Sequence, residues 1–207
     1  MNENSSKWIV AHRGLWINIR DQNSHFAISG ALNAGFAVES DFRDVFGEFV
    51  ISHDRPLKDN FIPFDTSWAE HRIAYNLKSD GLSPHFLRLL QSMNETQSFV
   101  FDGSIPEMLN LRNLGIPHAL RLSEYEKELS WDVNFVWVDG LNEDWWLNNT
   151  QILSLLENKH LIFVSPELHS RDHKRAFDWF SYLRANESIN FSVCTDYPIE
   201  LRDINES

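Results

Sequence analysis

Three short segments of the chain carry side chains that can transfer protons, bind a metal ion or bind phosphate. They are His12-Arg13-Gly14, Glu39-Ser40-Asp41 and Ser52-His53-Asp54. Each follows or ends a short run of apolar, β-favouring residues, which is typical of a buried strand. Because three such strands end in ionisable groups, the segments together indicate one shared site.

Glu39 and Asp41 are candidate metal ligands. They lie two positions apart, so in a strand both side chains point to the same face. Two carboxylates on one inward face repel each other unless a cation lies between them, and hard oxygen ligands suit Mg²⁺ or Ca²⁺. Alternatively, the two carboxylates form ion pairs with Arg43 or Arg13.

His12 and His53 are candidates for proton transfer, because two imidazoles on different strands can serve as general base and general acid near neutral pH. The guanidinium of Arg13 offers a planar set of donors that suits phosphate oxygens. Together with Lys78 and a metal ion, these groups are suited to the cleavage of a phosphodiester. Alternatively, the histidines are core residues with satisfied hydrogen bonds, and Lys78 is a solvated charge.

The rest of the sequence predicts a sheet that can position these residues. Continuous apolar strands alternate with amphipathic helices, as in a parallel sheet covered by helices. The expected strands cover 8–11, 36–41, 73–77, 98–101, 118–121, 134–138, 161–164 and 190–194, with a short extra strand at 49–52. The expected helices cover 26–34, 84–93, 104–115, a brief stretch from 123, 149–158, 173–185 and a last one from 199. Eight strand–helix units predict a single α/β domain over residues 1–207, a compact (β/α)8 TIM barrel.

Active sites of such barrels lie at the carboxyl ends of the strands. The residues expected there include Asn76 and Lys78 after the third barrel strand, and four acidic residues from later strands: Asp102, Asp139, Glu167 and Asp196. An Asp after a strand is a frequent helix N-cap, so these four are expected to cap helices or to orient neighbouring groups. Trp145-Trp146 follows the sixth barrel strand and either packs in the core or stacks on a substrate group.

Composition narrows the classes of partner and compartment. Lys and Arg number 18 against 30 Asp and Glu, a formal net charge of −12, which argues against nucleic acid or an anionic membrane as a bulk partner. The one cysteine, Cys194, cannot form an intrachain disulfide and is expected to be a buried apolar group. Because the sequence has no signal-peptide pattern and no apolar run that could span a bilayer, a soluble cytoplasmic protein is expected.

The motifs resemble the glycerophosphodiester phosphodiesterase family, and the related sphingomyelinase D and phosphatidylinositol phospholipase C barrels share its plan of two histidines. In the family's order, from the first to the last expected strand, the motifs are His12-Arg13-Gly14, Asn23-Ser24, Glu39-x-Asp41, Val50-Ile51-Ser52-His53-Asp54 and Thr195-Asp196-Tyr197-Pro198. The resemblance implies that His12 and His53 are the catalytic acid–base pair. It also implies that Glu39 and Asp41 bind the metal and that Arg13 contacts phosphate.

Two positions depart from the family pattern. The family's third metal ligand belongs to an acidic-x-Lys motif, which is Asn76-Leu77-Lys78 here. Lys78 therefore matches a substrate contact, whereas Asn76 would offer the metal a neutral carbonyl oxygen. Gln22 stands where the family usually has Glu. The loss of two negative charges is expected to weaken metal binding, and a sizeable insertion that often follows the second histidine is short here.

The resemblance implies a phosphoric diester hydrolase of lipid metabolism that acts on a small, soluble glycerophosphodiester-type substrate with Mg²⁺ or Ca²⁺. A hydroxyl neighbouring the phosphate would attack it, one histidine would take the hydroxyl proton, and the other would protonate the leaving alcohol. Two alternatives stay open: a lyase-like variant that releases the cyclic phosphate, and a catalytically weakened barrel that binds a phosphorylated ligand. The oligomeric state is not predicted.

Overall fold

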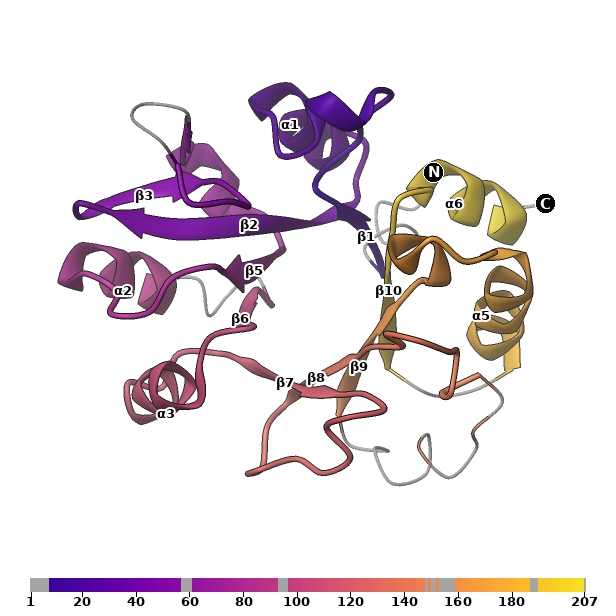
Figure 1. Cartoon of the computed structure of the whole chain (residues 1–207). Helices are drawn as coiled ribbons and strands as arrows, with labels where there is room; N and C mark the ends of the chain where they lie inside the picture. The colour runs from indigo at the N-terminus through magenta and orange to yellow at the C-terminus, as the bar shows by residue number, and fades with distance from the viewer. Residues whose placement is uncertain are drawn as a thin grey trace.

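The computed structural model describes residues 8–56, 61–92, 97–147, 149, 152, 159–186 and 190–206. The described chain has a mixed α/β fold, in which helices lie outside a strongly twisted sheet (Figure 1). Eight strands of this sheet run parallel to their neighbours: β1 (Ile9–His12), β2 (Ala37–Val45), β5 (Ile73–Leu77), β6 (Phe99–Phe101), β7 (Ala119–Leu122), β8 (Phe135–Val138), β9 (His160–Val164) and β10 (Phe191–Thr195). All eight expected barrel strands are therefore confirmed, with ends shifted by a few residues.

The order of the parallel strands is the one expected of a (β/α)8 barrel. On one side of β1 the neighbours are β2, β5 and β6, and on the other side they are β10, β9, β8 and β7. Between β6 and β7 the described residues form a single isolated parallel bridge, Val100 with His118, in which the Val100 amide donates to Pro117 O at 3.0 Å. Closure of the barrel stays a prediction, because among the described residues this one bridge is the only strand pairing between β6 and β7.

A hairpin extends the sheet beside the expected site. β2 continues beyond Asp41 and pairs antiparallel with β3 (Glu48–Ile51), which pairs in turn with β4 (Ile62–Pro63). The two-residue turn, Phe46-Gly47, has positive φ at both positions, 54° and 85°, as a type I′ turn requires. The hairpin returns the chain to the end of the barrel, where the Ser52 amide donates to Asp41 O at 3.0 Å.

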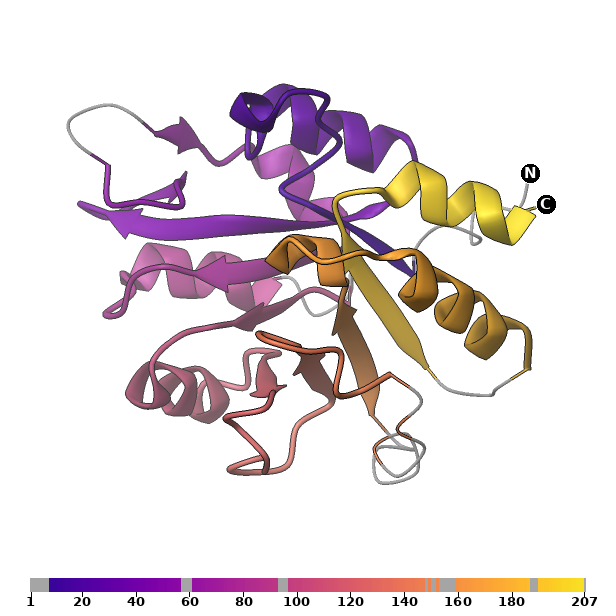
Figure 2. The same ribbon diagram turned by 45° about the vertical axis from the view of Figure 1, so that its right-hand side comes forward.

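The helices cover the outer face of the sheet (Figure 2). They are α1 (His25–Asn33), α2 (Pro84–Gln91), α3 (Ile105–Asn113), α5 (Lys174–Asn186) and α6 (Pro198–Glu206), with 3-10 helices η1 (Ile19–Asp21), η2 (Thr66–Glu70) and η4 (Pro166–His169). A serine caps each of the first three α-helices: the hydroxyls of Ser24, Ser83 and Ser104 accept a backbone N–H three residues later. None of the helices among these described residues is both long enough and apolar enough to cross a bilayer.

Alternate strand residues fill the interior of the sheet below the expected site. Small residues on three strands lie in the same cluster as large ones on others, and the rings of Phe101 and Trp137 stack with centroids 4.0 Å apart. The cluster consists of Val10, Ala37, Ala74, Phe99, Phe101, Ala119, Trp137, Ile162, Val164 and Cys194. The site therefore has a packed apolar floor, and the expectation that Cys194 is a buried apolar group is confirmed.

Two helix predictions have other outcomes. The segment after Ser123 has the contacts of a capping box, since the Ser123 hydroxyl accepts the Glu126 amide at 3.1 Å, but it does not form a helix. The carboxylate of Glu124 accepts backbone amides of residues 141–143, so the segment is tied to a neighbouring loop. The helix expected over 149–158 lies outside the described residues, apart from Asn149 and Ile152.

Gly14 is predicted to be irreplaceable in the turn that leads from β1 to α1. Its φ is +90°, and a Cβ there would lie 2.5 Å from Ala27 C and 2.7 Å from Ile28 N. We expect Gly14→Ala to lower the free energy of unfolding by roughly 2–4 kcal/mol, because strain and a backbone clash act together.

The matched control is Gly30→Ala within α1, where a Cβ meets nothing within 4 Å. This control should raise stability by about 0.5–1 kcal/mol. Urea unfolding of both variants checks the pair, and equal stabilities would contradict the prediction.

Candidate active site

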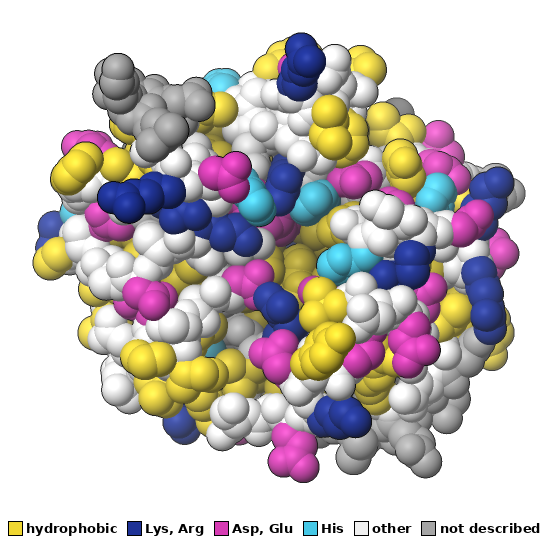
Figure 3. All heavy atoms as spheres, viewed as in Figure 1, with side chains coloured by type: hydrophobic (Ala, Val, Ile, Leu, Met, Phe, Trp, Pro, Cys, Tyr) yellow, Lys and Arg dark blue, Asp and Glu magenta, His cyan; other side chains and the backbone are white. Residues whose placement is uncertain are grey.

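The structure brings six of the seven predicted site residues into one network at the carboxyl ends of β1, β2 and β5. Figure 3, which shows the molecule from the same side as Figure 1, has acidic, basic and histidine side chains around the centre of this face. The amide of Arg13 donates to Glu39 O at 2.9 Å and so joins the contacts of Glu39 to those of Asp41. The six residues of the network are His12, Arg13, Glu39, Asp41, Asn76 and Lys78. His53 lies outside this network.

Asp41 is a fully buried carboxylate that is held by two cations. Arg13 Nε lies 2.9 Å from its Oδ2, and Lys78 Nζ lies 3.3 Å from its Oδ1. Asn23 Nδ2 also donates to Oδ2 at 2.8 Å, while Asn23 Oδ1 accepts the hydroxyl of Ser40 at 2.6 Å. The alternative ion pair between Asp41 and Arg13 is therefore confirmed, and Lys78 adds a second positive charge.

Arg43 has a different role from the ion pair considered for it. Its guanidinium donates to three backbone carbonyls, those of Ser52, His53 and Lys78. These carbonyls lie on the segments that follow β3 and β5, so Arg43 fastens the β3 end beside the β5 end. Of the two arginines considered as alternative ion-pair partners, Arg13 therefore pairs with a carboxylate, whereas Arg43 donates to backbone oxygens.

Glu39 is buried in the middle of the network, between His12 and Asn76. Asn76 Nδ2 donates to Glu39 Oε1 at 3.0 Å, and His12 Nε2 lies 3.8 Å from Oε2. Burial raises the pKa of Glu39 above its ordinary value, and the charge of Asp41 raises it further, whereas His12 and Arg13 lower it. The carboxyl group of Glu39 therefore takes up a proton at a higher pH than an exposed glutamate does.

The imidazole of His12 is oriented by Asp196, which follows β10. His12 Nδ1 and Asp196 Oδ1 lie 2.7 Å apart. Burial lowers the pKa of His12, but the hydrogen bond that its Nδ1 donates to Asp196 and the charges of Glu39 and Asp196 outweigh this, so the pKa is raised overall. Asp196 is itself fixed, because its amide donates to Glu167 Oε1 at 3.1 Å. The remaining nitrogen of His12, Nε2, is on the Glu39 side of the ring.

A cavity of about 390 Å³ opens over this network. The lining from β1, β2 and β5 is mainly charged or polar, whereas the lining from β6, β8, β9 and the segment after β9 mixes apolar side chains with carboxylates and a histidine. The lining residues are His12, Arg13, Ile19, Gln22, Glu39, Asn76, Phe101, Asp102, Trp137, Asp139, Val164, Glu167, Leu168, His169, Ser170 and Asp196. The cavity is large enough for a small organic phosphate and lies where barrel enzymes bind substrate.

His53 lies after β3 and is absent from the described lining of this cavity. Its side chain is 51% exposed, and its Nδ1 lies 2.8 Å from Oδ1 of Asp54, a side chain that is 94% exposed. No contact joins His53 to His12 within the described part of the chain. Its role as the second catalytic histidine therefore stays a prediction from the resemblance.

The chemistry of the donor set can be tested against a divalent metal. Three buried oxygens have no hydrogen-bond partner in the described structure: Glu39 Oε2, Asp41 Oδ1 and Asn76 Oδ1. Carboxylate and amide oxygens without a hydrogen bond suit a hard cation. However, Arg13 and Lys78 already balance the two carboxylates, and the described residues contain no group of three His, Cys, Asp or Glu that could hold a metal. The binding of Mg²⁺ or Ca²⁺ by Glu39, Asp41 and Asn76 therefore stays a prediction.

Two site features were missed by sequence reasoning. The hydrogen bond between Asp196 and His12 was not predicted, although Asp196 was expected to cap a helix or to orient a neighbouring group. His169 was not considered at all, yet it lines the cavity and its Nε2 lies 2.8 Å from Asp139 Oδ1. His169 follows β9 by a few residues, so counting further past each strand end would have found it.

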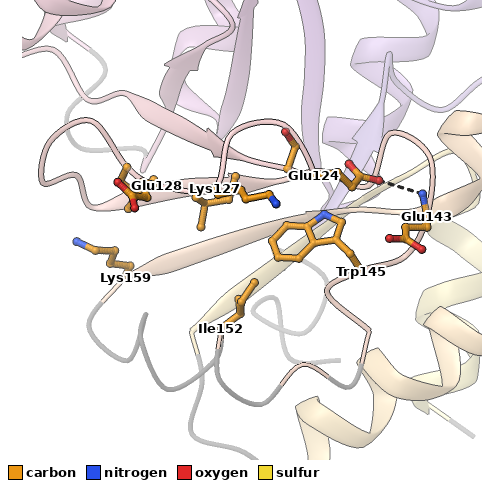
Figure 4. A pocket seen from close by; sticks show the side chains of 10 residues that line it. Glu124, Lys127, Glu128, Glu143, Trp145, Ile152 and Lys159 are labelled. Carbon is orange, nitrogen blue, oxygen red and sulfur yellow. Dashed lines mark hydrogen bonds between the residues drawn. The ribbon is translucent and has the colours of Figure 1, made fainter.

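A second cavity, of about 620 Å³, lies beside Trp145 (Figure 4). Its lining is mainly apolar and includes Leu129 and Ile152, with Glu124 bound to the 141–143 backbone. Trp145 lines this cavity and donates its indole N–H to Asp139 O at 2.6 Å, whereas Trp146 is completely buried among aromatic residues. Trp146 is therefore a core residue, and stacking on a substrate stays open for Trp145 alone.

Comparisons with known proteins place the fold. No family model matches the sequence, and a search of curated proteins gives no match. Among solved structures, the chain is similar to a glycerophosphodiester phosphodiesterase from Agrobacterium tumefaciens str. C58, with a TM-score of 0.67 and 14% sequence identity. The likeness covers 95% of this chain and 99% of the other. The chain therefore has the fold of a glycerophosphodiester phosphodiesterase over nearly its whole length.

Proposed function

We propose that the chain is a phosphoric diester hydrolase of the glycerophosphodiester phosphodiesterase type, built on a closed (β/α)8 barrel, which cleaves a small glycerophosphodiester-type substrate. One observation carries the proposal. An imidazole that a carboxylate orients, His12, lines the same cavity as Arg13 and Glu39 at the carboxyl ends of parallel strands. The shared fold and the order of the sequence motifs support the same conclusion.

The chain's own residues can supply most of the reaction. Arg13 and Lys78 would stabilise the charge that develops on the phosphoryl oxygens, because both cations lie at the same point beside Asp41. His12 would move a proton at Nε2, since Nδ1 is bound to Asp196. A divalent ion held by Glu39, Asp41 and Asn76 would supply further positive charge to the phosphoryl group. The resemblance assigns the second proton transfer to His53.

The second candidate function is binding of a phosphorylated ligand without turnover. It is favoured by Asn76 and Gln22, which are neutral, and by the two cations that already neutralise Asp41. Thermal stabilisation by a glycerophosphodiester without product formation would support it. Phosphorus NMR of any product separates hydrolysis to a monoester from release of a cyclic phosphate.

Replacing His12 is predicted to abolish turnover without unfolding the protein. We expect His12→Ala to lower kcat on a responsive glycerophosphodiester by about a hundredfold or more, which is the usual contribution of a positioned acid–base group. The assay is a panel of glycerophosphodiesters with Mg²⁺ or Ca²⁺. The control is His25→Ala, since His25 is an exposed histidine that pairs with Asp65 outside the site. Equal activity of His12→Ala and wild type would disprove the proposed catalysis.

Restoring a third carboxylate is predicted to tighten metal binding. We expect Asn76→Asp to bind Ca²⁺ or Mg²⁺ roughly tenfold more tightly than wild type, because the charge count of the ligands sets affinity. Without metal the variant should melt at a lower temperature, since a negative group replaces the donor to Glu39 Oε1. Calorimetric titration and thermal unfolding with metal or chelator measure both effects.

The matched control for this variant is Asn110→Asp on α3. Asn110 also donates its amide to a glutamate, Glu107 Oε1 at 3.2 Å, but it lies outside the site. Adding metal should change the melting temperature of Asn110→Asp by no more than it changes that of wild type. The same metal response in both variants, or none in Asn76→Asp, would refute the proposed metal position.

A further inference from the structure

The most exposed large hydrophobic side chains lie at the end of the molecule where the candidate site opens. Among the described residues, Ile17 is 99% exposed, Phe26 79% and Ile19 69%, and all three lie between the end of β1 and the first turn of α1. Others follow the ends of β2, β6, β7 and β10: Phe46, Ile105, Tyr125, Tyr197 and Ile199. Single exposed apolar residues are normal, whereas their concentration beside a site marks an interaction surface.

The large hydrophobic side chains elsewhere on the described surface are at most 56% exposed. They lie within helices or at the C-terminal ends of helices, away from the mouth of the cavity: Leu109, Leu114, Tyr182 and Ile204. The uneven distribution therefore belongs to the site end of the molecule and not to its surface as a whole.

Four of the exposed side chains form what we call the apolar rim: Ile17, Ile19, Tyr197 and Ile199. They lie on the segments that follow β1 and β10, two strands that pair directly with each other. Ile19 also lines the cavity together with His12 and Arg13, so the apolar rim begins at the cavity wall. Hydrophobic side chains lie beside the charged centre of this face, over the segment that joins β1 to α1 (Figure 3).

The loop between β1 and α1 holds its two exposed isoleucines outward. Before them, Leu15 packs against the hydrophobic core, and Trp16 donates its indole N–H to His12 O at 3.0 Å. After the first of them, the side chain of Asn18 caps η1 by accepting the Arg20 amide at 3.0 Å. The isoleucines cannot turn inward without breaking these contacts. Their exposure is unfavourable in water, and contact with an apolar partner removes that disadvantage.

A lipid surface suits the apolar rim better than a protein does. A protein on the rim would obstruct the mouth of the cavity, whereas a lipid surface would present phosphodiester head groups to it. This choice of partner rests on the proposed function, which needs that mouth open. The aromatic ring and hydroxyl of Tyr197 also suit the boundary between water and hydrocarbon.

The charge of the molecule selects the kind of lipid. The formal net charge is −12, which disfavours contact with anionic lipids. The charged residues that flank the apolar rim in the sequence carry both signs and include no cluster of Lys and Arg: Arg20, Asp21, Asp196, Glu200 and Arg202. A lipid surface without net charge is therefore the matching one.

We propose that the apolar rim docks the candidate site onto the surface of a zwitterionic lipid, from which the cavity takes a phosphodiester head group. Ile17 and Ile199 enter the boundary between head groups and acyl chains, and the mouth of the cavity faces the lipid. Hydrophobic contacts carry this docking, so it is reversible and changes little with salt.

Flotation with vesicles of pure phosphatidylcholine tests the docking without turnover. We expect wild type to float with these vesicles, and Ile17→Ser/Ile199→Ser to bind them at least tenfold more weakly, because two apolar contacts are lost. Adding phosphatidylglycerol should weaken the binding of wild type, and adding salt should change it by less than about twofold. The matched control is Leu109→Ser/Leu114→Ser on α3, which removes two exposed leucines outside the apolar rim and should bind as wild type does.

Several results would overturn the inference. These are no flotation of wild type, equal losses in the rim variant and the α3 control, or tighter binding when phosphatidylglycerol is added. A dimer of wild type in sedimentation velocity that is absent in Ile17→Ser/Ile199→Ser would also overturn it, since a second copy would then cover the apolar rim. Melting temperatures establish that each variant is folded.

A fluorescent label tests which face meets the lipid. The chain's one cysteine, Cys194, is buried, so Ile17→Cys can be labelled at the new thiol alone with a polarity-sensitive dye. With phosphatidylcholine vesicles, the emission of labelled Ile17→Cys should move to shorter wavelength, whereas that of labelled Leu114→Cys should stay unchanged. The reverse pattern contradicts the proposed orientation.

Activity separates this inference from the proposed function. On a water-soluble glycerophosphodiester, Ile17→Ser/Ile199→Ser should keep kcat/KM within about twofold of wild type. On lysophosphatidylcholine in the same vesicles, kcat/KM should fall at least tenfold, and an equal fall on both substrates overturns the docking. Turnover of the soluble diester by a wild type that binds no vesicles overturns the docking alone. Vesicle binding without turnover of any diester overturns the proposed function alone.

Discussion

The buried carboxylate of Asp41 is the constraint on which the site and the adjoining part of the fold depend. A buried charge is costly unless it is paired and hydrogen-bonded, and the partners of Asp41 come from three different segments. Arg13 follows β1, Lys78 follows β5, and Asn23 precedes α1. The interaction therefore fixes the first three parallel strands and the first helix relative to one another. It also explains the strained turn after β1, where Arg13 has φ of 57° so that its side chain can reach Asp41.

The same constraint governs what the site can bind. Because Arg13 and Lys78 together balance the charges of Asp41 and Glu39, the site is close to neutral, and a metal gains less there than beside three free carboxylates. A phosphate must share both cations with Asp41 instead of finding them free. Glu39 has one oxygen without a hydrogen-bond partner in the described structure, and burial raises its pKa. A proton, a metal ion or the imidazolium of His12 can each satisfy it, so these three compete at one position.

Local sequence signals were sufficient to predict the strands and the residues at their ends. Apolar runs and serine caps located β1, β2 and β5, and therefore brought His12, Glu39 and Asn76 together. Partners that are distant along the chain could not be predicted in this way. His12 and Asp196 are 184 residues apart, and their contact depends on how β10 closes against β1. The segment after Ser123 shows the opposite failure, because its local helix signal was overridden by the tie between Glu124 and the 141–143 loop.

The cavity lining also constrains the shape of a substrate, independently of the reaction. Arg13 lines the cavity on the β1 side. On the other side, the apolar residues Phe101, Trp137, Val164 and Leu168 line it together with the carboxylates of Asp102, Asp139 and Glu167. Burying a second anionic group against that surface would be unfavourable, since no described Lys or Arg lines it there. Arg121 on β7 is already paired with Asp102 and Glu126. A molecule with one phosphate and a compact organic substituent therefore fits the site better than one with two separated anionic groups.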